Sequence, residues 1–314
     1  MHLVAPPRAP RAASASAVRA GAAPIAPTRC AALALLAATL LVPTPGAAQS
    51  GPPSGSLVIV GGAMQDPEIV RAFLDLAGGP DAKIVVVPTA GGAEDAAYGP
   101  ECRCIRQLEA NGATNLTVLH TYDPAVAETE AFVEPLLDAD GVWFTGGRQW
   151  RLADSYLGTR TEAAFHAVLE RGGVIGGSSA GASIQADFMV RGDTRGNRAM
   201  IGDHTEGFGF MTGVGIDQHL LKRNRHFDLL EVIEARPDLL GIGLDEDTAI
   251  IVEGDEFRVI GSGYVAIYDA QADLDMGGDF YFMAPGDRFE ISTRTPMRGE
   301  RDRPVERVRG GGGG

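Results

Sequence analysis

The sequence predicts an α/β fold with a mainly parallel sheet that is covered by helices on both faces. Short apolar runs alternate with amphipathic stretches along the first half of the chain, and glycine-rich turns follow several of these runs. Strands that are apolar throughout and separated by helical segments are typical of a parallel sheet buried on both faces. After residue 240 the pattern changes to strand-like runs joined by short turns, which predicts C-terminal antiparallel hairpins.

The expected elements follow one another in a regular order. The five apolar runs that we expect to form strands are 57–60, 83–87, 116–119, 142–144 and 174–175. The amphipathic stretches that we expect to form helices lie near 66–77, 101–111, 124–138 and 160–171. The runs 248–252, 257–260 and 264–268, with turns at 253–255 and 261–263, predict the hairpins. Ligands of parallel sheets bind beyond the carboxyl ends of the strands, so the turns there are the places to seek function.

The chain divides into four expected segments. Residues 1–48 contain four arginines and no acid, then an apolar stretch and small residues, which is typical of a secretory signal peptide. That apolar stretch is shorter than the roughly 20 residues of a membrane span, so an uncleaved anchor is the less favoured alternative. We expect residues 49–55 to be a linker, 56–298 the folded domain, and 299–314 a disordered glycine-rich tail. The protein is therefore expected to be secreted or periplasmic.

The charge of the chain limits its partners. The net charge is −14, and removal of the four arginines of residues 1–48 leaves −18. No basic patch could dominate the field of so acidic a chain, so we expect neither nucleic acid nor, after signal cleavage, a membrane as a partner. No phosphate-binding or dinucleotide-binding loop is present, and no spacing of metal-ligand residues compels a metal site. We expect no cofactor and no metal.

The two cysteines beyond residue 48, Cys102 and Cys104, lie one residue apart within an expected helix. A disulfide across so short a loop would be strained. Two thiolates also make no zinc site without further ligands. We therefore expect two partly buried thiols, and whether they become oxidised after export stays open.

The segment 176–182 carries the pattern Gly-x-Ser-x-Gly, centred on Ser179, between an expected strand and a following helix. A serine on such a sharp turn has its Oγ exposed above the sheet, beside backbone N–H groups that can bind an oxyanion. In a chain with 42 glycines the pattern also fits a plain structural turn. Its position after an apolar run favours the hypothesis of a serine nucleophile in acyl transfer.

A serine nucleophile needs a base and an acid that orients it. Among the histidines, His219 lies at the end of an expected strand and is flanked by the ligand-like Asp217 and Gln218. The acidic turn 245–247 ends another expected strand, with Asp245 or Glu246 as candidates for the acid. For the oxyanion, the N–H of Ala180 follows the serine, and the glycine turn 145–149 could supply a second donor.

The order of these residues along the chain separates fold types. An α/β-hydrolase places its acid between the serine and the histidine. Here no histidine follows residue 226, so the acidic turn comes last. The esterase and lipase interpretation is therefore excluded.

Four separated motifs together resemble the cyanophycinases, a family of serine peptidases (peptidase family S51) related to aspartyl dipeptidase. These motifs are Gly-Gly-Ser-Ser-Ala-Gly-Ala, the Gly-Gly-x-Gln turn at 146–149, Asp-Gln-His at 217–219 with two arginines after it, and Gly-Ile-Gly-Leu-Asp-Glu at 241–246. The resemblance extends from about residue 56 to 285. It implies a class I glutamine amidotransferase-like fold.

The resemblance also implies roles for individual residues. Ser179 would be the nucleophile, His219 the base and Glu246 the orienting acid, with the N–H groups of Gly147 and Ala180 as the oxyanion hole. Residues matching the family's substrate pocket are Gln149, Asp217, Gln218, Arg223 and Arg225. The implied activity is hydrolysis of β-aspartyl linkages in cyanophycin, a poly-aspartate with arginine side groups, to release β-Asp-Arg dipeptides. Arginines hold carboxylates by bidentate hydrogen bonds, and Asp217 could hold a cationic group.

Two departures from the family pattern bear on the substrate. Arg148 stands where the family usually has Asp or Asn, and Asp228 stands where a third arginine is often found. Alternatives are a relative that acts on other isoaspartyl or aspartyl dipeptides, and a non-catalytic periplasmic binding protein. The family resemblance also makes a homodimer possible.

Overall fold

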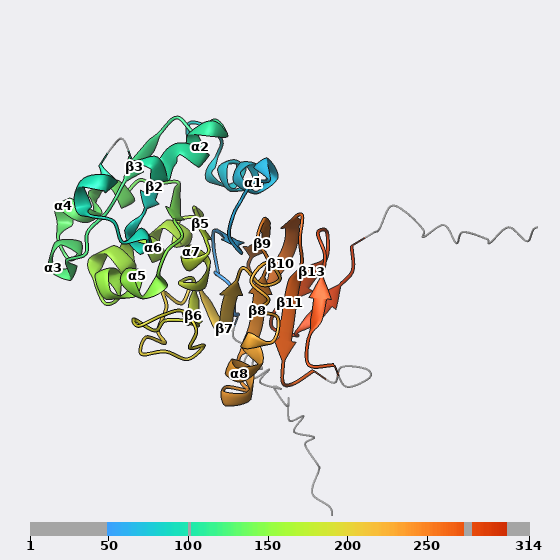
Figure 1. The fold of residues 1–314 in the computed structure, drawn as a ribbon. Helices are drawn as coiled ribbons and strands as arrows, with labels where there is room; N and C mark the ends of the chain where they lie inside the picture. The colour runs from blue at the N-terminus through green and yellow to red at the C-terminus, as the bar shows by residue number, and fades with distance from the viewer. Residues whose placement is uncertain (1–48, 100–101, 273–277, 300–314) are drawn as a thin grey trace, which may run out of the picture. The chain divides into compact units, whose positions relative to one another are not determined.

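The computed structural model describes residues 49–99, 102–272 and 278–299, and the predicted signal peptide and the tail beyond residue 299 lie outside this part of the chain. Two sheets form the centre of the fold (Figure 1). The larger sheet runs in the order β14-β13-β10-β9-β1-β5-β4-β2-β3. Its strands are β1 (Ser56–Val60), β2 (Ile84–Val87), β3 (Leu116–Val118), β4 (Gly141–Phe144), β5 (Val174–Ser178), β9 (Thr248–Glu253), β10 (Glu256–Gly261), β13 (Arg288–Glu290) and β14 (Thr295–Met297).

The five strands predicted from the apolar runs are neighbours in this sheet and pair in parallel, as expected. Strand β9 then pairs antiparallel with β1, and β10 with β9, so the hairpin predicted around 253–255 forms and extends the sheet. The fold class predicted from the sequence is confirmed.

A second sheet of five strands runs in the order β12-β11-β8-β7-β6. These strands are β6 (Ala186–Phe188), β7 (Met211–Gln218), β8 (Leu240–Leu244), β11 (Val265–Asp269) and β12 (Tyr281–Met283). The predicted second hairpin is wrong, because β11 pairs with β8 rather than with β10. The turn at 261–263 instead passes the chain between the sheets, with Ser262 N–H bonded to Asp247 O and Gly263 N–H to Thr248 Oγ1.

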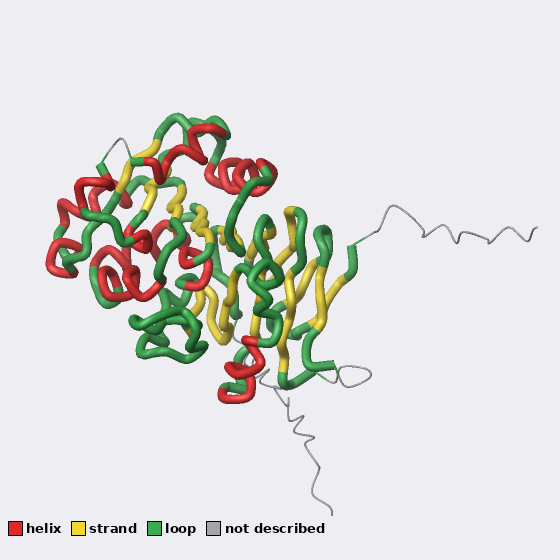
Figure 2. The backbone as a smooth tube through the Cα atoms, in the orientation of Figure 1, coloured by secondary structure: helices red, strands yellow, loops and turns green. Residues whose placement is uncertain are grey.

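Helices cover both faces of the parallel strands, mainly in the first half of the chain (Figure 1 and Figure 2). The helices are α1 (Pro67–Ala77), α2 (Arg106–Ala110), α3 (Pro124–Ala127), α4 (Glu130–Val133), α5 (Gln149–Tyr156), α6 (Arg160–Glu170), α7 (Ala180–Ser183) and α8 (Asp228–Ala235), with 3-10 turns η1 (Thr89–Gly91), η2 (Asp95–Tyr98), η3 (Arg103–Ile105) and η4 (Glu134–Leu136). The single helix expected over 124–138 is divided, because Thr129 caps a new helix and a separate 3-10 turn begins at Glu134, with Pro135 as its second residue.

Helix α1 illustrates how local sequence places these elements. Asp66 caps its N-terminus by accepting from Glu68 N–H at 2.8 Å, Pro67 fills the first position, and Gly78 ends it at φ 107°. The apolar face of α1 packs on one face of the sheet, where the ring centroids of Phe73 and Trp143 are 4.9 Å apart. Helices α5 and α6 cover the opposite face, in an apolar cluster that continues into the second sheet.

Cys102 and Cys104, whose oxidation state the sequence left open, form a disulfide. Their Cα atoms are 5.1 Å apart, within the ordinary range for a disulfide. The expected helix does not include Cys102, which has an extended conformation before η3 (φ −55°, ψ 133°). This bend at the start of the turn brings the two sulfurs together, which a continuous helix would not do.

Residues 49–55, predicted to be a linker, lie against the folded part. The Ser50 carbonyl accepts from Thr212 N–H at 2.8 Å, and the Ser50 N–H donates to Asp255 Oδ1 at 3.2 Å. Within the described residues, no helix is long and apolar enough to cross a bilayer.

Gly176 in β5 tests how tightly the sheet and α1 are packed. A Cβ at this position would lie 2.5 Å from Trp143 Cε3 and 2.7 Å from Phe73 Cδ2, both in the buried core. We expect Gly176→Ala to lower the free energy of unfolding by about 1–3 kcal/mol through overpacking. Urea denaturation measures it. Gly196→Ala is the control, because a Cβ there would have no atom within 4 Å, and equal stability of the two variants would contradict the packing.

Candidate active site

The sharp turn predicted at Ser179 is present between β5 and α7. Ser179 has φ 58° and ψ −110°, a conformation that costs a non-glycine residue about 1–3 kcal/mol. Glycines on both sides permit the close approach of strand and helix, because a Cβ at Gly177 would lie 2.2 Å from Gly181 O. The strain is therefore held by packing, and it turns the Ser179 hydroxyl out of the sheet.

Ser179, His219 and Glu246 form a continuous hydrogen-bonded chain. Ser179 Oγ lies 2.9 Å from His219 Nε2, and His219 Nδ1 lies 2.6 Å from Glu246 Oε1. The serine follows β5 of the larger sheet, whereas the histidine and the glutamate follow β7 and β8 of the smaller one. This is the geometry of a nucleophile, a base and an acid that fixes the tautomer of the base.

The end of β1 holds all three segments in place. Three successive carbonyls accept one backbone N–H from each: Val60 O from Ser179, Gly61 O from His219, and Gly62 O from Asp247, each at 2.9 Å. Gly62, at φ 124°, must be glycine, because a Cβ there would lie 2.3 Å from the His219 ring. The Gly61-Gly62 turn is thus a template for the site.

The three acids of the turn 245–247 have separate partners. Asp245 Oδ1 accepts from the N–H groups of Leu221 and Lys222, both at 3.0 Å, and so holds the loop after His219. Asp247 Oδ1 accepts from the N–H groups of Gln65 and Asp66. Of the two acids that sequence reasoning left open, Glu246 is the one that contacts the imidazole.

His219 is buried, with 7% of its surface exposed. Burial lowers the pKa of His219 below 6.5, because it penalises the charged form. The hydrogen bond to Glu246 acts in the opposite direction, and the charges of Arg223 and Arg225 again lower the pKa. The imidazole is therefore neutral, and able to accept a proton, near neutral pH.

The glycine turn 145–147 lies against Ser179. A Cβ at Gly146 would be 3.4 Å from Ser179 Cβ. Gly147 has φ 149°, and a Cβ there would lie 2.0 Å from Ala90 O. Among the described residues, neither Gly147 N–H nor Ala180 N–H donates a hydrogen bond to another group of the chain. Both expected oxyanion donors are thus unengaged.

Asp217 differs most from its expected role. It is fully buried and makes a bidentate pair with Arg191, with Nε–Oδ1 at 2.7 Å and Nη2–Oδ2 at 2.9 Å. Arg191 also binds Asp228, one of the two departures from the family pattern that the sequence resemblance indicated. Both carboxylate oxygens of Asp217 are therefore engaged by Arg191. Arg191 carries no motif signal in the sequence, so only the structure reveals it.

The other expected substrate residues lie at different depths. Gln149 is buried and donates to Val190 O at 2.7 Å. Gln218 and Arg225 are also buried and bind each other, with Arg225 Nη1 3.0 Å from Gln218 Oε1. The side chain of Arg223 is exposed, and its backbone N–H donates to the backbone carbonyl of His219 at 3.0 Å. Of the five expected substrate residues, Arg223 is the one with an exposed side chain beside the base.

Arg148, the departure in the glycine turn, points away from the serine. Its guanidinium donates to the carbonyls of Asp193 and Gly196 in a neighbouring loop. No group of three or more potential metal ligands gathers anywhere in the described ranges 49–99, 102–272 and 278–299.

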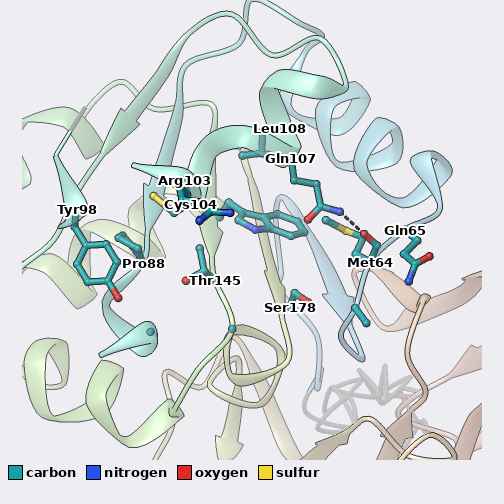
Figure 3. Close-up of a pocket in the computed structure, with 14 residues that line it drawn as sticks. Met64, Gln65, Pro88, Tyr98, Arg103, Cys104, Gln107, Leu108, Thr145 and Ser178 are labelled. Carbon is teal, nitrogen blue, oxygen red and sulfur yellow. Dashed lines mark hydrogen bonds between the residues drawn. The ribbon is translucent and has the colours of Figure 1, made fainter. Parts of the chain in front are cut away.

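A cavity of about 570 Å³ adjoins the serine turn (Figure 3). Gly146 and Ser178, next to Ser179, line it together with Thr145. Its other walls come from the loops after β1 and β2 and from η3 and α2, including Tyr98 and Arg103. Sequence reasoning missed this wall, because η3 and α2 carry no recognisable motif.

The chain is similar to known peptidases over most of its length. The model of peptidase family S51 matches residues 57–260. The cyanophycinase of Geminocystis herdmanii is 33% identical over 266 residues, which cover 78% of this chain and 96% of that protein. The cyanophycinase of Synechococcus elongatus is 35% identical over 225 residues, which cover 68% of each chain. The crystal structure of a peptidase from an acI-B1 Actinobacterium has the same fold, with a TM-score of 0.56 at 23% identity over 76% of this chain and 97% of that one.

The proximity of Arg223 gives a prediction for the titration of His219. We expect Arg223→Gln to raise the pKa of His219, because a positive charge that disfavours the imidazolium is removed. NMR titration of the imidazole measures it, with Arg236→Gln, paired to Asp238 just after α8, as the control. An unchanged titration of His219 in Arg223→Gln would contradict the electrostatic effect.

The lowered pKa of His219 also predicts how stability depends on pH. In the wild type the pKa of His219 in the folded state lies below 6.5, so the folded state binds fewer protons than the unfolded state just below that pH. The free energy of unfolding should therefore fall as the pH drops from 6.5 through the folded pKa.

Proposed function

The chain belongs to peptidase family S51, and on that premise we propose that it is a serine peptidase that cleaves a cyanophycin-like polymer through an acyl-enzyme on Ser179. The observation that carries this proposal is the chain of contacts from Ser179 Oγ to His219 Nε2 at 2.9 Å and from His219 Nδ1 to Glu246 Oε1 at 2.6 Å. The names of the similar cyanophycinases support the substrate.

In the proposed reaction Ser179 Oγ attacks the scissile carbonyl while His219 Nε2 takes the hydroxyl proton. Glu246 stabilises the imidazolium at Nδ1 without itself becoming protonated. The N–H groups of Gly147 and Ala180 bind the oxyanion. His219 then gives its proton to the leaving amine, and water hydrolyses the acyl-enzyme by the same steps in reverse.

The form of the product defines which bond is cut. A released β-Asp-Arg dipeptide retains the β-aspartyl link to arginine, so the bond that breaks must be an amide of the aspartate backbone. This corrects the expectation from the sequence resemblance that the β-aspartyl linkage itself is cut, because cutting that linkage would release free arginine. Arg223, exposed next to His219, is the residue that we assign to a substrate carboxylate. Gln149, Gln218 and Arg225 are buried behind the site and would support the groups that face the substrate, and Asp217 would act through Arg191 as a positioning residue.

We also infer that the protein is exported. The composition of residues 1–48 supports a signal peptide. The Cys102–Cys104 disulfide supports the same conclusion, because disulfides persist in oxidising compartments. The substrate would then be polymer outside the cytoplasm.

Loss of the nucleophile tests the proposed chemistry. We expect Ser179→Ala to reduce dipeptide release from insoluble cyanophycin about a million-fold, as removal of a triad serine does. Mass analysis of the soluble products measures it. Ser54→Ala is the control, because Ser54 precedes β1 at the opposite end of the strand from the site. Undiminished release by Ser179→Ala would refute the assignment.

Export has its own test. We expect the protein recovered from the periplasm or medium to begin near residue 49, because the small residues before it fit a signal-peptidase site. N-terminal sequencing measures this start. Recovery of the chain in the cytoplasm with residues 1–48 attached would contradict export.

A further inference from the structure

The cavity beside the serine turn carries a charged side chain that the catalytic chemistry does not use. Of the residues that line it, all of which are described, Arg103 alone is charged. The remaining polar groups are neutral, among them Tyr98, Gln107 and Thr145. In Figure 3 Arg103 and Gln107 lie on one side of the cavity, Tyr98 on another, and Thr145 and Ser178 below them. Such a cavity attracts an anion, and its lining has no acidic side chain that could pair with a cation.

The wall that carries Arg103 is held in place on both sides. The disulfide joins the two residues that flank it, and Cys104 N–H also lies 3.1 Å from Cys102 Sγ. Leu108 anchors α2 in the core with 1% of its surface exposed. Gln107 Nε2 donates to Met64 O across to the loop after β1 (Figure 3). The backbone of Arg103 is thus preorganised, which reduces the entropy lost on binding.

We propose that this cavity is a substrate subsite, in which Arg103 binds a carboxylate of the polymer. The proposal rests on the proposed function and adds a specificity-determining residue to it. Each β-Asp-Arg unit has a free carboxylate on its arginine, because the arginine is joined through its amino group. The planar guanidinium of Arg103 matches a carboxylate in bidentate geometry. A volume of about 570 Å³ is within the usual range for a small-molecule site.

The subsite is separate from the pocket implied by the sequence motifs. Within the described part of the chain, the cavity walls include none of Gln149, Asp217, Gln218, Arg223 and Arg225. Its floor is nevertheless shared with the reacting group, because a Cβ at Gly146 would lie 3.8 Å from Ser179 Oγ. One polymer chain can therefore reach both Arg103 and the serine, so Arg103 would select substrates that carry a carboxylate near the scissile bond.

A pair of synthetic oligomers tests the subsite by binding alone. One is a β-Asp-Arg trimer with free arginine carboxylates, and the other is the same trimer with those carboxylates converted to amides. The full chain with Ser179→Ala binds both without turnover, and calorimetry gives both dissociation constants. We expect the free-acid trimer to bind roughly ten-fold tighter, and Arg103→Gln to reduce this preference, while any part that Arg223 contributes remains.

Matched variants separate charge at the cavity from charge in general. Arg106→Gln removes an exposed arginine from the first position of α2, outside the cavity lining, and should keep the whole preference. Arg103→Lys should keep part of it, because the charge remains without the planar fork. Cys102→Ser combined with Cys104→Ser should weaken the preference while a serine-directed probe still labels Ser179 in the otherwise wild-type chain.

The outcomes distinguish this proposal from the proposed function. If the wild type hydrolyses the trimer but Arg103→Gln keeps the full preference for the free-acid trimer, the subsite is refuted and the proposed function is not. A preference that depends on Arg103 without any hydrolysis sustains the subsite and refutes the function. Equal binding of the two trimers by the Ser179→Ala chain also overturns the subsite.

Discussion

The end of strand β1 is the constraint on which the site depends. Its carbonyls at Val60, Gly61 and Gly62 receive the backbone N–H groups of Ser179, His219 and Asp247 in turn. The serine belongs to one sheet, and the histidine and the glutamate belong to the other, so no local sequence pattern could bring them together. Backbone hydrogen bonds that lie close to the reacting groups fix their separation better than side-chain contacts alone would. The glycines at 61 and 62 leave the room that this arrangement needs.

A buried ion cluster holds the floor of the same region. Arg191 links the fully buried Asp217 to the partly exposed Asp228, across the loop after β6 and the start of α8. Buried charges are retained where they are paired and hydrogen-bonded, as here. The cluster gives Asp228 a partner from outside its own segment, because the positive charge comes from Arg191 in the loop after β6. Asp228 therefore completes a pair and does not remove a charge from the pocket.

The cavity and the disulfide show how a wall outside the sequence motifs takes part in the site. The bend at Cys102 places Arg103 at the cavity and lets the two sulfurs meet. The same disulfide is consistent with export, since it requires an oxidising compartment to persist. The disulfide, which supports the proposed export, and Arg103, which supports the proposed substrate subsite, both lie at η3.

The sequence by itself determined the parallel strands, the serine turn and the order serine, histidine, acid, because these depend on apolar periodicity and on glycines at tight turns. Spacing alone left Asp245 and Glu246 open as the acid, since neighbouring residues on a turn point in different directions, and only the family resemblance favoured Glu246. The sequence did not reveal the partner of Asp217, the disulfide between the cysteines or the path of the turn 261–263. Only the tertiary structure decided these points, because each depends on a partner or a bend that no local pattern encodes: Arg191 for Asp217, β8 for β11, and the extended backbone at Cys102 for the disulfide.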